Sequence, residues 1–434
     1  MTLQRLNPAD HFTLVLDHEI RKSGLAGNYC ALAMELDGVP DHAEIARCCS
    51  AFAKRFPLAV ARLSRQGRQY AWVPADDDSL PFHVSKLDED VGSAACQQQR
   101  LLAIVNKDTP VSVSAPFELH LIESASRSLL ALCWFHPAAD AKGAELVLHY
   151  LFNNPQPERQ PQPVPVDHLQ QQWGLWRKFR LARQAVANIH GLDRKASILP
   201  PNTQCLADRL ALKLVRYDAE QTARIMSHAR KHSGMTGTTL YLIGCMMRAM
   251  EATGATRTGE AYCVPYAANL RRRKALFPVL GNQVSFLFAQ AERDMVCSRA
   301  QLFPHLRDQN RAAIRQGLDH AMLPLMQAGS WLSLEKYGRI VRESPRKRER
   351  SSFWFSYTGD MEPEPVAIAG CRVQGIYQLS QVSSPPGLVL LASSFQGRLV
   401  LSYNYINNQF DNDWLKRLTQ AMTAELLDID EKYL

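Results

Sequence analysis

Residues 129–140 read Leu-Leu-Ala-Leu-Cys-Trp-Phe-His-Pro-Ala-Ala-Asp, an apolar run that ends at a histidine followed by proline. The apolar run from Leu129 to Phe135 predicts a buried strand. Pro137 directs the chain out of the sheet, so we expect His136 at the end of the strand, where a loop begins. Helical periodicity returns from Gly143 to Phe152. The stretch therefore predicts a strand, a turn that carries a histidine, and a helix.

Strand and helix patterns alternate on both sides of this stretch. Asp41 with Glu44, and Asp218 with Gln221, form capping patterns at the start of two helices. Strands are expected at residues 28–36, 68–73, 116–122, 209–216, 261–265, 353–356, 388–395 and 399–405. Further helices are expected at residues 93–106, 238–250 and 413–427. This mixture in two similar halves predicts an α/β sandwich of two layered lobes, with mixed sheets, flanking helices and a groove between the lobes.

The chain is too long for one ordinary core, and two domains are expected from its 434 residues. A proline-rich run between Asn153 and Val166 can hold neither a helix nor a central strand. We therefore expect an N-terminal lobe over residues 1–155, a linker over 156–204 and a C-terminal lobe over 205–434. The linker contains a basic, aromatic segment, 173–190. It is interpreted as a connecting helix or, alternatively, as a surface helix that touches lipid or a carrier protein.

The composition is that of a folded globular protein, with 46% hydrophobic and 21% charged residues. Ten scattered cysteines without a C-x-x-C pair indicate a reducing, cytoplasmic compartment, and we see neither a signal peptide nor a membrane span. The net charge of +8 favours acidic partners, which include nucleic acid, an anionic membrane, an acidic carrier protein or a phosphorylated cofactor. Charge alone does not choose among them.

His136 is the strongest candidate for chemistry. An imidazole with a pKa near 6.5 can accept a proton at neutral pH, although a lone histidine can also be purely structural. Asp140 follows in the same turn, where it can orient His136 or pair with an arginine that braces the loop. No group of His, Cys, Asp and Glu shows metal-ligand spacing, so no metal is expected.

The segment from Phe135 to Gly143 resembles the His-His-x-x-x-Asp-Gly motif of peptide-synthetase condensation domains, bacterial wax ester synthases and plant BAHD acyltransferases. The second histidine of that motif, the catalytic one, falls on His136, and its aspartate falls on Asp140. Phe135 stands in place of the first histidine. Ala141 stands in place of the motif glycine. The resemblance implies a two-lobed chloramphenicol-acetyltransferase-like fold of the CoA-dependent acyltransferase superfamily, with the active site between the lobes.

Later segments extend the resemblance. Residues 264–271 resemble the family's Pro-x-x-x-Asn-Leu-Arg strand end, which implies that Arg271 pairs with Asp140. Residues 281–285 resemble a Gly-Asn segment beside the acyl-donor channel, and residues 357–360 fall where the family has a glycine-containing segment near the active site. The resemblance thus assigns the substrate or donor channel to four residues: Asn282, Ser285, Tyr357 and Gly359.

The implied reaction is acyl transfer from a coenzyme A or carrier-protein thioester to a small hydroxyl or amine acceptor. His136 would act as general base, and donors near Gly359 would hold the oxyanion. No bound cofactor is implied. The other hypotheses are a free-standing condensation-type enzyme that forms an amide, and a non-catalytic member that binds an acyl carrier.

Two basic runs, 271–274 and 346–350, are expected either as solvated surface or as attractors for the phosphates of coenzyme A or for an acidic carrier protein. Nucleic acid is not expected as a partner, because no recognisable binding module accompanies these runs. Peripheral membrane contact stays open through the segment 173–190.

Overall fold

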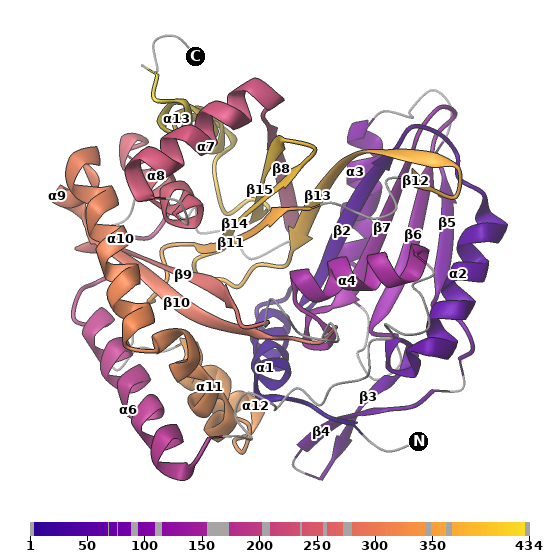
Figure 1. The fold of residues 1–434 in the computed structure, drawn as a ribbon, viewed down its shortest axis with the longest axis horizontal. Coiled ribbons are helices and arrows are strands. Elements are labelled where there is room, and N and C mark those ends of the chain that lie inside the picture. Colours follow the sequence, from indigo (N-terminus) through magenta and orange to yellow (C-terminus); the bar gives the residue numbers. More distant parts are fainter. Residues whose placement is uncertain are drawn as a thin grey trace.

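A computed structural model describes residues 4–67, 69–75, 77–87, 94–108, 115–153, 173–201, 209–234, 237–254, 258–271, 280–342, 349–361 and 367–429. It shows two lobes, each built around a six-stranded sheet with helices on its outer face (Figure 1). The predicted α/β class with two-lobed, mixed sheets is confirmed. Within these ranges, none of the helices has the length and apolarity needed to span a bilayer.

The N-terminal sheet has the strand that leads to His136, β7, in its interior. Its order is β12-β13-β2-β7-β6-β5. The strands are β2 (Tyr29–Leu36), β5 (Phe82–Lys86), β6 (Phe117–Glu123), β7 (Ser128–Phe135), β12 (Ala367–Ile368) and β13 (Cys371–Ser380). Helices α2 (His42–Arg55) and α4 (Ala141–Phe152) cover one face, where Leu130 and Leu132 pack against Ile45 and Val147. Asp41 caps α2, as predicted, by accepting the Ala43 and Glu44 N–H groups.

The C-terminal sheet has the order β10-β9-β11-β14-β15-β8. Its strands are β8 (Leu210–Arg216), β9 (Ala261–Asn269), β10 (Val284–Glu292), β11 (Trp354–Asp360), β14 (Leu388–Phe395) and β15 (Arg398–Ile406). The outer layer consists of α7 (Ala219–Ser233), α8 (Thr238–Ala252), α9 (Arg293–Val296), α10 (Arg299–Arg315) and α13 (Asn412–Leu427). The apolar helix α8 is buried on nearly all sides, as the sequence predicts.

The two sheets face each other across an apolar layer. Ala131 and Phe135 of β7 lie in one cluster with Leu391 of β14 and Leu212 of β8. Helix α3 (Ala94–Val105) adds to this layer. The inner faces of both sheets therefore form one continuous core, and the end of β7 opens at the junction between the lobes.

One hairpin crosses between the lobes. Strand β13, from the C-terminal part of the chain, pairs antiparallel with β2 over Val373 to Ser380, so the N-terminal sheet takes its β12–β13 edge from residues 367–380 (Figure 1). The lobe boundaries at residues 155 and 205 stay a prediction. The hairpin, at residues 367–380, belongs by sequence to the predicted C-terminal lobe, 205–434, but its strands belong to the N-terminal sheet.

The remaining elements include the helix that lies between the two lobes. Helix α1 (Pro8–Lys22) lies between the lobes and contacts α11 and α12 (Figure 1). The other elements are α6 (Leu175–Leu192), α11 (Leu318–Gly329), α12 (Leu334–Arg342), short 3-10 turns at Pro57–Val60 and His136–Ala138, and a small sheet of β1 (Gln4–Arg5), β3 (Arg62–Gln66) and β4 (Gln69–Val73).

Candidate active site

His136 begins a 3-10 turn directly after β7, which fixes its backbone between two strands. Its N–H donates to the Asn28 carbonyl at 3.0 Å, which extends the β2–β7 ladder by one residue. Its own carbonyl accepts from the Ala139 N–H at 3.2 Å. The Trp134 indole N–H donates to the Ala139 carbonyl at 2.9 Å and closes the turn from the other side. The position of the imidazole is therefore set by a fully bonded backbone.

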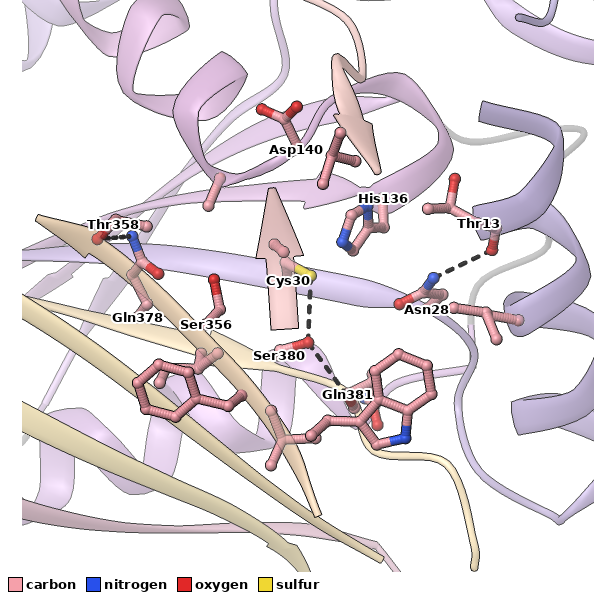
Figure 2. Close-up of a pocket in the computed structure, with 18 of the residues that line it drawn as sticks. Thr13, Asn28, Cys30, His136, Asp140, Ser356, Thr358, Gln378, Ser380 and Gln381 are labelled. Carbon is pink, nitrogen blue, oxygen red and sulfur yellow. Dashed lines mark hydrogen bonds between the residues drawn. The ribbon is translucent and has the colours of Figure 1, made fainter. Parts of the chain in front are cut away.

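Asp140 is the N-cap of α4, and its carboxylate is occupied by structural donors. The Gly143 N–H donates to Oδ1 at 2.8 Å, and both Arg271 Nη1 and the Gln283 N–H donate to Oδ2 at 2.8 Å. Figure 2 shows the carboxylate turned away from the His136 ring. Burial alone would raise the pKa of Asp140, but the Arg271 guanidinium and the backbone donors hold it below its ordinary value. The structure thus brings Asp140 and Arg271 together, as the resemblance implies.

The turn also requires a glycine, at a position displaced from the motif. A Cβ atom on Gly143 would lie 1.9 Å from the Leu280 carbonyl oxygen, so only glycine fits this close approach of two backbones. Ala141, which replaces the motif glycine, is the first residue of α4 and lines the cavity described below. The change at residue 141 therefore leaves the turn intact.

Asn282 holds the backbone of the turn that begins at His136. Its amide Nδ2 donates to the His136 carbonyl and to Asp10 Oδ1, both at 2.9 Å, and the residue is 1% exposed. Burial, opposed by hydrogen bonds from Asn282 and Asn7, raises the pKa of Asp10 to about 7. Asn282 and the fully buried Ser285 are not among the residues that line the cavity. Their predicted channel role stays a prediction, and the contacts give Asn282 a positioning role.

His136 opens into a cavity of about 260 Å³ to which both lobes contribute (Figure 2). Its wall is apolar around a few polar side chains, and sequence reasoning missed most of the latter: Thr13, Asn28, Ser356, Thr358, Gln378 and Ser380. Of the predicted channel residues, Tyr357 lines the cavity and Gly359 does not. Gly359 lies within β11 at a bulge, with φ of +82°. Asn28 carried one usable signal, because it is the first residue of a predicted strand.

The environment of His136 favours the neutral imidazole. Burial lowers its pKa, although Asp140 acts in the opposite direction, and Nδ1 has no hydrogen-bond partner in the described part of the chain. A neutral imidazole is the form that accepts a proton. The lowered pKa therefore makes His136 suited to accept a proton at neutral pH.

A pH profile tests this state. Because the pKa of His136 is lowered, the base should be lost only as the pH falls through a value below the ordinary histidine pKa of about 6.5. We expect kcat/KM to be flat from about pH 7 upward and to decline on the acid side with a midpoint below about 6.5. A midpoint above that value would contradict the buried, neutral imidazole.

A second cavity of about 550 Å³ adjoins the first and was not predicted. The two share Leu16, Phe286, Trp354 and Ser383 as lining residues. Its wall is mainly apolar and comes from α1, α6, α11, α12 and β10, with residues that include Phe12, Phe288, Met322, Leu325 and Val341. An apolar chamber thus lies directly behind the wall of the histidine cavity.

The structure describes only part of the two basic runs that were expected either as solvated surface or as attractors for the donor. Residues 272–274 and 346–348 lie outside the described residues. Arg350 differs from the exposed surface that was expected, since it makes two hydrogen bonds to Asp193, at 2.7 and 3.0 Å. The side chains of this pair are only 14% and 6% exposed. Arg350 is therefore held in a buried ion pair, and it also lines the second cavity.

Solved structures of acyl-transfer proteins align with nearly the whole chain. The first condensation domain of the calcium-dependent antibiotic synthetase aligns with a TM-score of 0.74 and 12% identity, over 99% of this chain and 98% of that one. A trichothecene 15-O-acetyltransferase from Fusarium sporotrichioides aligns with a TM-score of 0.72 and 11% identity, over 98% and 94%. The starter condensation domain of rhizomide synthetase, in complex with C8-CoA, gives 0.71 and 9%, also over 98% and 94%.

These alignments confirm the expected fold. The chain has the two-lobed fold shared by condensation domains and the trichothecene acetyltransferase. No protein-family model matches the sequence. No curated protein matches it either. At identities this low the likeness establishes the fold alone.

Proposed function

We propose that this protein transfers an acyl group from a coenzyme A or carrier-protein thioester to a hydroxyl or amine acceptor, with His136 as general base. The observation that carries the proposal is a backbone-anchored imidazole at the junction of two lobes, with a pKa that burial lowers, opening into a cavity that both lobes line. The same proposal treats residues 1–155 and 205–434 as the two lobes and 156–204 as their linker.

The chemistry needs no covalent enzyme intermediate. His136 takes the proton from the acceptor O–H or N–H as the acceptor oxygen or nitrogen attacks the thioester carbonyl carbon. The carbonyl oxygen becomes an oxyanion, and hydroxyl groups on β11, from Ser356 and Thr358, line the cavity where it would form. The C–S bond then breaks, and the imidazolium returns its proton to the leaving thiolate. Asp140, Arg271 and Asn282 act indirectly, by positioning the turn.

The second cavity gives the acyl chain a place to lie. An apolar chamber that shares Phe286 and Trp354 with the histidine cavity suits the tail of a donor whose thioester lies beside His136. Each buried methylene is worth about 0.8 kcal/mol. The chamber therefore favours donors with long or bulky apolar acyl groups over acetyl donors.

Filling the chamber should change selectivity for the acyl chain. Leu325→Trp places a larger side chain in the second cavity, so decanoyl donors should lose at least about tenfold in kcat/KM, the value of roughly two methylenes. Acetyl donors should change little. Rates of thiol release from acetyl- and decanoyl-CoA measure this, with Ile314→Trp, on the exposed outside of α10, as the matched control. Equal losses for both donors would show that the acyl chain does not bind in this chamber.

Helix α6 supports peripheral membrane contact as part of the same proposal. Its N-terminal part exposes Leu175, Trp176 and Phe179 at 84%, 85% and 61%, among the basic side chains Arg177, Lys178, Arg180 and Arg183. Exposed aromatic and basic side chains of this kind suit an anionic lipid surface. Further along α6, Ile189 and His190 line the second cavity. A cytoplasmic location also belongs to this proposal, supported by buried thiols such as Cys133.

Binding to vesicles tests the helix. The protein should sediment with vesicles that contain phosphatidylserine, and less so in high salt, because screening weakens the attraction of the arginines and lysine. Trp176→Ser combined with Phe179→Ser should abolish sedimentation without changing turnover of a soluble donor. Sedimentation that survives both substitutions would place the membrane contact elsewhere.

A panel of acyl thioesters tests the overall proposal. The protein is incubated with acetyl-, octanoyl- and decanoyl-CoA and with mixed hydroxyl or amine acceptors, and thiol release is recorded. Release that depends on an acceptor is expected. Binding of acyl-CoA without any release would favour the non-catalytic hypothesis instead.

A further inference from the structure

Two histidines and a glutamate meet on the outer strands of the N-terminal sheet. Strand β5 is the edge strand and runs parallel to β6, with His83 directly opposite His120. Glu118 lies two residues before His120 on β6. Side chains two residues apart point to the same face of a strand, and directly opposite residues are neighbours on that face. The sheet therefore places these three side chains together.

The three side chains bring one possible ligand atom each close to the other two. His120 Nε2 lies 3.3 Å and His83 Nε2 lies 3.8 Å from the same Glu118 oxygen, Oε2. One ligand atom from each residue lies within 4.8 Å of the other two, and the two rings stack with centroids 4.7 Å apart. The His83 side chain is 52% exposed and that of His120 is 11% exposed. The cluster is thus rooted in the sheet and reachable from solvent.

We propose that His83, Glu118 and His120 bind one divalent transition-metal ion, of which Zn²⁺ suits the ligands best. Two imidazole nitrogens and one carboxylate oxygen form a common zinc ligand set, with water in the fourth tetrahedral position. Bond lengths of about 2.0–2.2 Å would require the three ligand atoms to close in from separations of up to 4.8 Å, the stacked rings to turn toward the ion, and the contact between His120 Nε2 and Glu118 Oε2 to give way to it. Sequence spacing did not reveal this site, because the ligands come from two separate strands that meet only in the fold.

Two neighbouring side chains affect how strongly the site would bind a metal ion. Lys107 lies close enough to act on both Glu118 and His83, so its ammonium group opposes a bound cation. Neutralising it should tighten metal binding. Cys133 lies opposite Glu118 on β7 and is 5% exposed, which leaves it as a competing ligand that the test has to distinguish.

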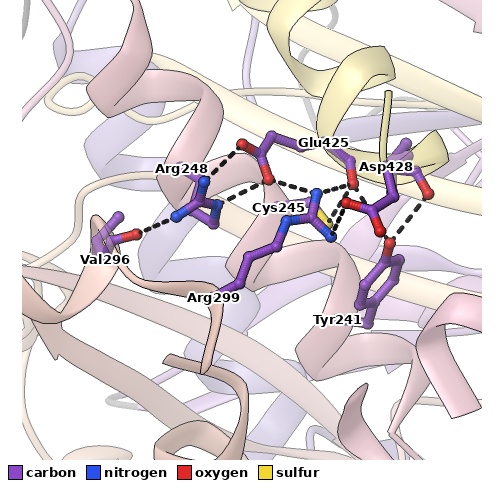
Figure 3. Close-up of polar contacts among 8 residues, drawn as sticks. Tyr241, Cys245, Arg248, Val296, Arg299, Glu425 and Asp428 are labelled. Carbon is purple, nitrogen blue, oxygen red and sulfur yellow. Dashed lines mark hydrogen bonds and ion pairs between the residues drawn. The ribbon is translucent and has the colours of Figure 1, made fainter. Parts of the chain in front are cut away.

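A second cluster, His228, His232 and Asp428, has similar geometry but lacks a usable carboxylate. Arg299 Nη1 lies 3.3 Å from Asp428 Oδ1, and the same guanidinium is held by Glu425 at 2.6 Å (Figure 3). An arginine fixed beside the carboxylate repels a metal ion. This second cluster therefore serves as an internal control.

The bound ion would stabilise the N-terminal lobe. It would join the edge strand β5 to β6, and β6 pairs along its whole length with β7, which ends at His136. The cluster lies on β5 and β6, and none of its three residues lines either cavity. We therefore expect the metal to stabilise the lobe without taking part in acyl transfer.

Titration of the chelator-treated full chain with Zn²⁺ and Co²⁺ tests the site. We expect one equivalent of Zn²⁺ to bind and to raise the melting temperature, and Co²⁺ to give the visible absorption of a tetrahedral site. His83→Ala and Glu118→Gln should each raise the Kd for Zn²⁺. The increase should exceed the roughly 10–100-fold loss of affinity that is typical when an outer-shell partner is removed. Lys107→Met should tighten binding, and His228→Ala should leave it unchanged.

Several outcomes would overturn the proposal. Absence of stoichiometric binding by the wild-type chain is one, and unchanged affinity in His83→Ala, whose exposed side chain can be removed without disturbing the core, is another. A Co²⁺ spectrum with an intense thiolate band would place the ion on a cysteine. Acyl-transfer activity is a separate readout, so a failure here leaves the proposed function untouched.

Discussion

Replacing His136 with alanine should lower the rate of acyl transfer by roughly 100-fold or more, the contribution expected of a positioned general base. The backbone of the turn is held by Asn28, Ala139 and Asn282 through main-chain groups of His136, so the fold should survive the substitution. Thiol release from an acyl-CoA, measured with and without acceptor, gives the rate. Circular dichroism and the melting temperature show whether the fold is retained.

The matched control is His149→Ala, on the helix that follows. His149 hydrogen-bonds to Asn153 and is not among the residues that line either cavity. Its loss should leave the rate near that of the wild type. If His136→Ala also kept nearly full activity, His136 would be a structural histidine and the base would have to be another group.

Asp140→Asn should destabilise the protein by about 3–5 kcal/mol, the cost of leaving one member of a buried ion pair without its partner. The Asp140 and Arg271 side chains are only 11% and 12% exposed, and the same carboxylate oxygen also accepts from the Gln283 N–H. The loss therefore combines charge and hydrogen bonds. Urea unfolding at pH 7 measures it, and Glu335→Gln, in a pair with side chains 64% and 61% exposed, should have a much smaller effect.

The pH dependence of this difference has a defined sign. Because the folded-state pKa of Asp140 is lowered, its stabilisation is complete above the ordinary carboxyl pKa and is lost as the pH falls through the folded value. The stability gap between wild type and Asp140→Asn should therefore narrow in acid. A gap that stays constant down to the acid limit would mean that the charge of Asp140 contributes nothing.

Elements that depend on short-range sequence patterns were predicted correctly. The strand ending at Phe135 and the cap at Asp41 depend on neighbouring residues, and both lie where they were expected. The capping box of Asp218 and Gln221 also forms, at the start of α7. Short-range patterns of this kind are readable because their cause lies within one or two turns of the chain.

Elements whose cause lies elsewhere in the chain were missed. Helices α10 and α11 contain Pro304 and Pro324, which normally argue against a helix. Strand β13 contains Gly375 and alternates exposed and buried residues at its start, and it exists because β2 offers it an edge. Packing against a distant partner decided these cases.

The candidate site shows the same division. His136 and Asp140 stand in one short motif, and Arg271 was reached through the resemblance. The positioning role of Asn282 depends on Asp10 of α1, 272 positions away. The buried pairing of Arg350 depends on Asp193, which is 157 positions away. Neither contact leaves a pattern in the neighbouring sequence.

The hairpin that crosses between the lobes has a consequence for synthesis on the ribosome. Strand β2 ends at Leu36, but its partner β13 is complete only when Ser380 has been made. At about 5–20 residues per second, that edge of β2 waits roughly 20–70 seconds for its native neighbour. During this interval its unpaired N–H and C=O groups can capture another strand. We therefore expect the nascent chain to expose this edge to other chains until Ser380 has been made. If the two halves were made as separate polypeptides, the first could complete its sheet only after binding the second.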